Sequence, residues 1–177
     1  MSILYVSGSP RPHSNTDYLL SLLQDQTGGE LIKLTDHSIR PCLACWACRQ
    51  RGSCVLPDDF TSILVPKLLS ASAVILGSPV FFNNVTAQMK SFIDRTWSLR
   101  GKLKDKVGGA VVVGRRYGSE GAITAINGFF LKHQMLIADR GVSGLAFESG
   151  EVAQDAESIA AARRLGARIV ELTDGVH

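Results

Sequence analysis

The segment "ILYVSGSPRPHSNTDYLLSLL", residues 3–23, combines three patterns that together indicate a fold. It opens with a short run of aliphatic and aromatic residues, which is the composition of a β-strand. It closes with leucines at helical spacing, which form the apolar stripe of an amphipathic helix. The loop between the two is rich in hydroxyl groups. We therefore expect a strand, a loop and a helix, in that order.

The same alternation of apolar runs and helical patterns continues to the end of the chain. The runs "SAVILGSPV" and "KVGGAVVVGRR" are nearly all apolar, as in strands that are buried on both faces of a sheet. Strands are expected at residues 3–8, 29–36, 72–80, 106–116 and 135–141, and helices at residues 15–26, 57–71, 84–100, 119–134 and 153–173.

Apolar strands that alternate with helices predict βαβ units and a parallel sheet with helices on both faces. Five strands and five helices fit an α/β fold, the doubly wound flavodoxin-like sheet with strand order 2-1-3-4-5. The length of 177 residues suits one domain over residues 1–177. A cysteine-rich insertion at about residues 41–57 follows the second strand.

Composition excludes several classes of function. The net charge is only +3 and the basic residues are scattered, so we expect no nucleic-acid partner. The first residues lack a basic leader, and no apolar run is long enough to span a membrane, so a cytoplasmic location is expected. Thiols stay reduced in the cytoplasm, so the 4 cysteines indicate metal binding or redox chemistry.

The loop "SGSPRPHSNT", residues 7–16, is a candidate phosphate site. It opens onto a helix N-terminus, where free N–H groups and the helix dipole favour an anion. Arg11 can hold two phosphate oxygens at once. The loop lacks G-x-G-x-x-G and Walker A patterns and suits a terminal phosphate monoester, as in FMN. Alternatively, it is a plain connection in which Ser14 or Asn15 caps the helix.

Two further loops, "GSPVFFNN" (residues 77–84) and "GRRYGSEG" (residues 114–121), follow strands that end at the same crevice. Backbone amides and small residues there allow a flat ring to approach closely. Phe81 or Phe82 could stack on such a ring or shield it from water. The alternative is that both phenylalanines belong to the hydrophobic core.

All the cysteines lie in the run "CLACWACRQRGSC", residues 42–54, with the spacing C-x2-C-x2-C-x5-C. Bacterial ferredoxin runs open in the same way, so this spacing favours a cubane [4Fe–4S] cluster. Structural zinc, which usually takes two separated pairs of ligands, and a C-x2-C redox dithiol are the alternatives. The expected cluster ligands are Cys42, Cys45, Cys48 and Cys54.

On "GSPRPHSNT", "GSPVFFNNVTAQMKSFIDR" and the cysteine run, the chain resembles the NADPH-dependent FMN reductase superfamily, and more narrowly its iron–sulfur flavoproteins. The resemblance covers about residues 3–140. It implies a phosphate site at Ser9, Arg11, Ser14, Asn15 and Thr16, a ring site at Pro79, Val80, Phe81, Phe82 and Asn83, a third flavin loop with Gly114, Arg115 and Gly118, and a compact four-cysteine [4Fe–4S] motif.

The expected function is therefore that of an FMN-binding, [4Fe–4S]-carrying electron-transfer flavoprotein, which is a flavin-dependent oxidoreductase. Electrons would pass from a donor such as NAD(P)H or ferredoxin to a small-molecule or protein acceptor. No catalytic side chain is required, because the cofactors carry the chemistry. The resemblance also implies a homo-oligomer, a dimer or tetramer, in which cluster and flavin approach across a subunit interface. The alternatives are an NAD(P)H-dependent FMN or quinone reductase without a cluster, and a non-enzymatic zinc-stabilised binding protein.

Overall fold

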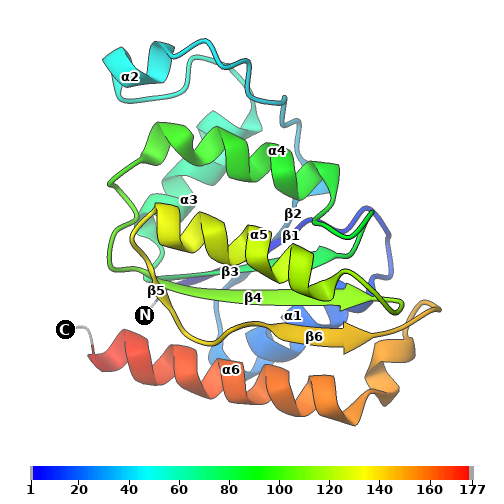
Figure 1. Cartoon of the computed structure of the whole chain (residues 1–177). Coiled ribbons are helices and arrows are strands. Elements are labelled where there is room, and N and C mark those ends of the chain that lie inside the picture. Colours follow the sequence, from blue (N-terminus) through cyan, green and yellow to red (C-terminus); the bar gives the residue numbers. More distant parts are fainter. Residues whose placement is uncertain (1, 176–177) are drawn as a thin grey trace.

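The computed structural model describes residues 2–175, which form a parallel β-sheet with helices on both faces (Figure 1). The sheet order is β2-β1-β3-β4-β5, and β6 also pairs with β4. This confirms the predicted flavodoxin-like order 2-1-3-4-5. The strands are β1 (Ile3–Ser7), β2 (Glu30–Lys33), β3 (Ala73–Pro79), β4 (Val107–Gly114), β5 (Leu136–Ile137) and β6 (Val142–Leu145).

The helices form two layers, with α1 and α6 on one face of the sheet and α3, α4 and α5 on the other (Figure 1). The short helix α2 stands apart from both layers, in the cysteine-rich insertion. The bounds are α1 (Asn15–Thr27), α2 (Ala47–Arg51), α3 (Val65–Ser70), α4 (Ala87–Arg95), α5 (Ser119–Lys132) and α6 (Ala156–Gly175), with 3₁₀ turns η1 (Leu34–Asp36), η3 (Thr96–Leu99) and η4 (Glu151–Gln154) and a π turn η2 (Phe60–Leu64).

The edge of the sheet next to β4 differs from the prediction, which was a single strand at residues 135–141. It is shared by β5, which pairs with the start of β4, and β6, which pairs with its end. The chain turns between them at Gly141, whose φ of 129° suits glycine. Asn127 of α5 holds this turn by donating to the Arg140 carbonyl at 2.8 Å. The added strand carries the following loop to the carboxyl edge of the sheet.

Two of the expected helices are shorter or less regular than predicted. The pattern at residues 57–71 forms the π turn η2 and then α3, because Pro66 has no N–H to continue the α-helical ladder. The helix expected from residue 84 begins only at Ala87. Thr86 caps it by accepting the Met89 N–H at 3.2 Å, and its last turn tightens into η3.

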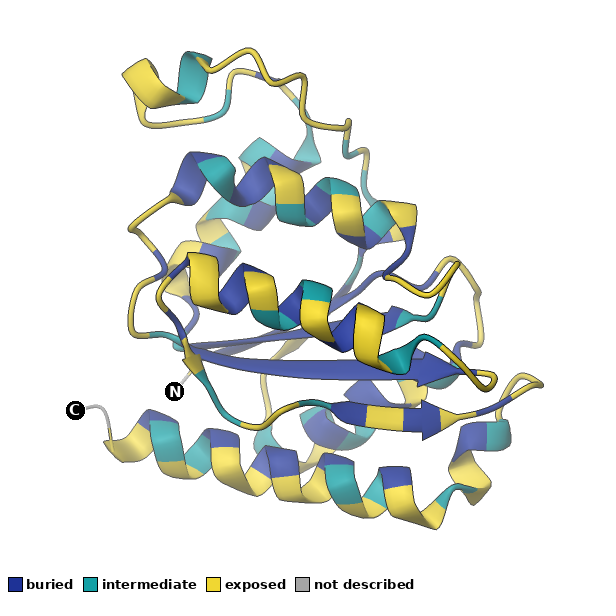
Figure 2. Ribbon diagram, viewed as in Figure 1, coloured by how far each residue is buried: buried dark blue, intermediate teal, exposed yellow. Residues whose placement is uncertain are grey.

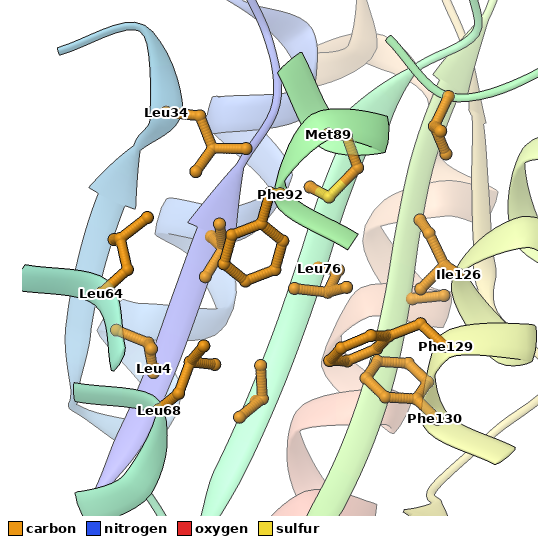
Figure 3. Packing of buried hydrophobic residues seen from close by; sticks show 14 of the residues in the cluster. Leu4, Leu34, Leu64, Leu68, Leu76, Met89, Phe92, Ile126, Phe129 and Phe130 are labelled. Atoms are coloured by element: carbon orange, nitrogen blue, oxygen red, sulfur yellow. The ribbon is translucent and has the colours of Figure 1, made fainter. Parts of the chain in front are cut away.

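Buried side chains fill the space on both sides of the sheet, and β3 and β4 are buried along nearly their whole length (Figure 2). On one face, Phe92 of α4 and Phe129 and Phe130 of α5 pack over the strands near Leu76 (Figure 3). Each large apolar side chain that is fully buried contributes about 1.5–3 kcal/mol. This core fixes the strand ends and thus the loops that follow them. Within residues 2–175, no helix has the length and apolar character needed to cross a membrane.

Candidate functional site

The loop after β1 is pinned between β3 and α4. The Gly8 N–H donates to the Gly77 carbonyl at 2.8 Å, and the Gly8 carbonyl accepts from the Thr86 hydroxyl at 2.7 Å. A Cβ atom at Gly8 would lie 2.8 Å from the Met89 Cβ, which is too close for any other residue without a shift. The loop therefore begins from a fixed backbone position at the carboxyl edge of the sheet.

Two of the polar residues expected at the phosphate site build the loop itself. The Ser14 hydroxyl caps α1 by accepting the N–H groups of Thr16 and Asp17 at 3.1 and 3.3 Å. The Asn15 side chain donates to the Glu148 carbonyl at 2.8 Å and accepts the Val152 N–H at 3.4 Å, so it ties the loop to the segment after β6. The capping alternative thus describes Ser14 correctly.

Thr16 carries an unsatisfied polar atom at this site. Thr16 is 1% exposed and lines a crevice beside the loop. Its hydroxyl group has no hydrogen-bond partner among residues 2–175. A buried polar group without a partner costs about 1–3 kcal/mol. Ser9, also buried, and the exposed Arg11 line the same crevice. All three side chains carry hydrogen-bond donors, which is the chemistry that an anionic group requires.

A lysine that the sequence analysis did not single out braces this loop. The Lys33 Nζ, at the end of β2, donates to the Arg11 carbonyl and pairs with the Asp17 carboxylate at 2.5 Å. The other Asp17 oxygen accepts from the Ser7 hydroxyl. Lys33 lies beside Ser7 in the β1–β2 register, so the sheet order would have been the signal for it.

The crevice has a volume of about 100 Å³ and is bounded by all three predicted loops. Ala146 and Phe147, which follow β6, were not anticipated because β6 itself was not. The lining residues are Ser9, Arg11, Ser14, Asn15, Thr16, Pro79, Val80, Phe81, Val113, Gly114, Arg115, Ala146 and Phe147.

Three of the predicted flavin residues, Phe82, Asn83 and Gly118, do not line the crevice. Phe82 is fully exposed at the tip of a turn that is closed by paired backbone bonds between Phe81 and Asn84 at 2.8 and 3.0 Å. Asn83 packs on Gly118, where a Cβ would lie only 2.5 Å from the Asn83 Cα. The lack of a side chain at Gly118 therefore lets the turn of residues 81–84 pack closely there, and this turn places Phe82 in solvent at the rim of the crevice.

The cysteine loop encloses a second and larger cavity, of about 390 Å³. All four cysteines are free thiols, and all four line this cavity. Its other walls are mostly apolar, with Trp46 of the loop and Trp97 of η3 meeting edge to face at a centroid distance of 5.9 Å. Every residue predicted as a cluster ligand therefore lines the same cavity.

The cysteine loop is mostly exposed (Figure 2), and its backbone is partly strained. Ala44 and Trp46 adopt left-handed conformations, with φ of 50° and 60°, which cost non-glycine residues about 1–3 kcal/mol each. One contact between this loop and the rest of the protein is the bond from Lys102 Nζ to the Gly52 carbonyl at 2.7 Å. Strained backbone of this kind is concentrated at functional sites.

A buried ion pair closes the neck of this loop. The Asp58 carboxylate accepts the Arg40 N–H at 3.0 Å and both terminal nitrogens of Arg95, at 2.7 and 2.9 Å. Arg95 also donates to the Arg40 carbonyl at 2.8 Å. The Asp58 and Arg95 side chains are only 4% and 0% exposed. The helix expected over residues 57–71 contains Asp58 near its start, and the sequence offered no reason to single out Asp58 or Arg95.

The neck stays ionised because its charges compensate each other. Burial acts to raise the pKa of Asp58, but hydrogen bonds from Arg95 and from the Arg40 N–H outweigh it and hold the pKa below its usual value. Burial likewise acts to lower the pKa of Arg95. Hydrogen bonding to Asp58 and interactions with Cys54 and Asp58 outweigh that effect and raise it.

The thiols share a cavity without meeting at a point. Among the residues that the structure describes, no three His, Cys, Asp or Glu side chains are grouped to hold a single metal ion. Zinc needs four ligands at about 2.0–2.3 Å from one centre. An iron–sulfur cubane takes one thiolate at each iron and therefore accepts ligands that are more widely spread.

The two cavities lie at opposite ends of α4. The crevice contains residues 79–81, which precede the helix, and the thiol cavity contains Asp94 and Arg95 at its end. With 9 residues, α4 spans roughly 13 Å.

The sheet order and the crevice at the carboxyl ends of its strands define a flavodoxin-like α/β fold. The solved structure of an archaeal flavodoxin matches 98% of this chain and 99% of its own, with a TM-score of 0.64 at 15% identity. That of RosB matches 99% of this chain and 80% of its own, with a TM-score of 0.82 at 14% identity.

The chain belongs to the NADPH-dependent FMN reductase family, whose model matches residues 1–150. An iron–sulfur flavoprotein of Methanocaldococcus jannaschii is 37% identical over 97% of both chains, which places this chain in the iron–sulfur flavoprotein branch. The predicted resemblance is thus confirmed. The protein is a flavin-dependent oxidoreductase that binds FMN.

Proposed function

We propose that this protein is an electron-transfer flavoprotein in which Cys42, Cys45, Cys48 and Cys54 hold one [4Fe–4S] cluster. The observation that carries the proposal is that the only thiols of the chain all line one cavity. Their spacing in the sequence, C-x2-C-x2-C-x5-C, favours a polynuclear cluster over the two separated ligand pairs that are usual for zinc. The name of the M. jannaschii relative, an iron–sulfur flavoprotein, supports the same reading.

For FMN, we propose that the phosphate lies against Ser9, Arg11 and Thr16. The unpartnered Thr16 hydroxyl supports this placement, and Ser14 and Asn15 hold the loop in shape. The RosB structure contains a bound riboflavin-5′-phosphate derivative, which is consistent with a phosphorylated flavin on this fold. The flavin ring is assigned to Pro79, Val80, Phe81, Phe82 and Asn83, with Gly114, Arg115 and Gly118 as the third loop.

The crevice volume of about 100 Å³ is small for a complete nucleotide, so it encloses only part of FMN. The remainder would lie at the open rim, where Phe81 and Phe147 are half exposed and Phe82 is fully exposed. These side chains would shield the ring from water, and the backbone of Gly114 and Arg115 would face its edge.

The chemistry belongs to the cofactors: FMN exchanges electrons in pairs with a hydride donor and singly with a one-electron centre, which an iron–sulfur cluster provides. The side chains bind and orient the two groups and shield them from water. The donor is proposed to be NAD(P)H or ferredoxin, and the acceptor a small molecule or a protein.

We also propose that residues 1–177 act as one domain within a homo-oligomer, a dimer or tetramer. The two cavities of one chain lie at opposite ends of α4, which supports an arrangement in which a second copy brings the cluster of one chain closer to the flavin of the other. Leu43 and Trp46 at the thiol cavity are 66% and 58% exposed, which supports a covered surface there.

The test is the metal content of protein prepared without oxygen. We expect iron and acid-labile sulfide at four per chain, together with one FMN. Cys48→Ser should lose most of the iron and sulfide but keep FMN, because the flavin loops lie at the other end of α4. Ser53→Ala, in the same exposed loop, is the matched control and should keep both.

Stoichiometric zinc without sulfide would contradict the cluster and leave a zinc-stabilised flavoprotein. FMN without any metal would leave a plain FMN or quinone reductase. Loss of FMN from Cys48→Ser would contradict the independence of the two sites.

A further inference from the structure

The wall of the thiol cavity contains a fully buried guanidinium group with one unused donor. A guanidinium has five N–H groups. In Arg95, one terminal nitrogen donates to the Arg40 carbonyl and to Asp58, and the other donates to Asp58 and to the Thr61 hydroxyl. These four contacts account for the terminal N–H groups and leave only the Nε–H.

This Nε–H has no hydrogen-bond partner within residues 2–175, although the Arg95 side chain is 0% exposed. Water cannot satisfy it, so it lacks the compensation that buried donors normally find. Arg95 lines the same cavity as the cysteines. Of the four thiols of this cavity, Cys54 is the nearest in the chain to Asp58, which Arg95 bonds at 2.7 and 2.9 Å. The charge interaction of Cys54 with Arg95 also acts to raise the pKa of the guanidinium.

The other cationic side chains of the loop are placed differently. Arg49 and Arg51 are exposed to solvent, and Arg40 is 53% exposed at its side chain and lies 3.8 Å from Asp58. Charges in water are screened, whereas a buried donor acts at close range in a low dielectric. Arg95 is therefore the cation able to single out one cysteine.

We propose that Arg95 donates its Nε–H to the Sγ of Cys54 when that sulfur is a thiolate, and so positions this cysteine and tunes the group that it holds. The inference rests on the proposed function, because the thiolate is the form that ligates iron. Arg95 is thus a positioning residue with two tasks: its terminal nitrogens close the neck of the loop, and its Nε–H acts on one ligand.

The proposed hydrogen bond should change the reduction potential of a bound cluster in one direction. A hydrogen bond to a ligating sulfur withdraws electron density and favours the more negative, reduced state, so it raises the reduction potential. The rival explanation is that Arg95 serves only the ion pair with Asp58. That role predicts effects on folding and on loop closure but no specific link to Cys54.

The first experiment needs no cluster and observes the side-chain Nε–H signals of arginine by NMR, in the metal-free, reduced full-length protein at about pH 9.5, which is above the pKa of an ordinary thiol. The Arg95 signal is identified as the one that disappears in the Arg95→Lys variant. We expect Cys54→Ala to shift this signal and to speed its exchange with water, and Cys42→Ala, which removes another thiol of the same cavity, to leave it unchanged. An Arg95 signal that ignores Cys54→Ala would overturn the proposal, whether or not the protein binds iron.

The second experiment compares reduction potentials in the loaded protein. Arg95→Lys keeps the positive charge but loses the planar fork, and it should shift the cluster potential to a more negative value without moving that of the flavin. Arg49→Lys, an exposed arginine of the same loop, should move neither. An unchanged cluster potential in an Arg95→Lys protein with full iron and sulfide would also overturn the proposal. If Arg95→Lys fails to fold, the NMR experiment on Cys54→Ala still tests the proposal. The Arg95 signal is then assigned in the spectrum of the wild-type protein.

Discussion

The crevice at the strand ends, where we propose that FMN binds, and the thiol cavity differ in how their side chains are held. The crevice is built from segments that directly follow β1, β3, β4 and β6, and the buried core fixes those strand ends. The thiol cavity is enclosed by an exposed loop that is fastened mainly at its neck, by Asp58 and Arg95, and by the packing of Trp46 on Trp97.

This difference shows two ways of preparing a cofactor site. The sheet positions the crevice before any ligand arrives, so single changes there should alter affinity without altering the fold. The cysteine loop depends on a few buried contacts, so its order should depend on those contacts and on the bound group. The following predictions, from the largest effect to the smallest, test that contrast.

Arg11→Ala should weaken FMN binding by about 1.5–3 kcal/mol, or roughly 10- to 150-fold, because a charge-assisted contact to phosphate is lost. The change lies in the crevice, so thermal stability and the iron content should stay the same. Titration with FMN and with riboflavin provides the measurement. Riboflavin lacks the phosphate and should bind equally well to both proteins. Equal losses for the two ligands would place the phosphate elsewhere.

Lys33→Met should weaken FMN binding by about 1 kcal/mol, or roughly fivefold. Lys33 holds the Arg11 carbonyl and the Asp17 carboxylate, so its loss should loosen the phosphate loop. The matched control is Lys67→Met, which breaks the pair with Glu30 at 2.7 Å outside the loop. A control that weakens FMN as much as Lys33→Met would show a general loss of stability instead.

A change from pH 8 to pH 6 should lower the free energy of unfolding by about 0.8 kcal/mol through His133. Burial, aided by the charge of Lys132, lowers the pKa of His133 to about 4. The unfolded chain therefore takes up the proton first as the pH falls through about 6.5, and stability is lost from there toward pH 4.

Guanidinium denaturation of the wild type and of His133→Gln at both pH values would isolate this effect, since glutamine does not titrate. His133 contacts the Thr96 hydroxyl at 3.0 Å and so supports η3, which carries Trp97 of the thiol cavity. Acid should thus weaken the cysteine side of the molecule, while FMN affinity stays constant over this range. An equal pH dependence in both proteins would contradict the assignment.

Much of the fold was predictable because its strands are apolar runs separated by helical patterns. β6 was missed because it has four residues and alternates buried and exposed positions, next to a turn that resembles a strand end. That omission also hid Ala146 and Phe147, which enter the crevice only through β6.

The spacing of the cysteines was enough to predict a metal or redox site, whereas the residues that support the loop could not be predicted from the sequence. Arg95 lies 37 positions from Asp58 and inside a helix whose pattern is ordinary, so only the packing of α4 reveals their contact. For Phe82 the sequence pattern was misleading, because this apolar residue follows a buried strand and yet is fully exposed. Its position is set by the turn that rests on Gly118, which no local pattern encodes.

The short helix α4 is hydrogen-bonded at both ends: Thr86 donates to the Gly8 carbonyl in the loop after β1, and Arg95 donates to the Arg40 carbonyl at the neck of the cysteine loop. Each residue of an α-helix advances the chain by about 1.5 Å and turns it by about 100°. One inserted or deleted residue would therefore swing Arg95 out of the neck while Thr86 stayed in place. This segment should tolerate changes of side chain but not of length, so insertions and deletions among relatives that keep both sites should fall outside Thr86–Arg95.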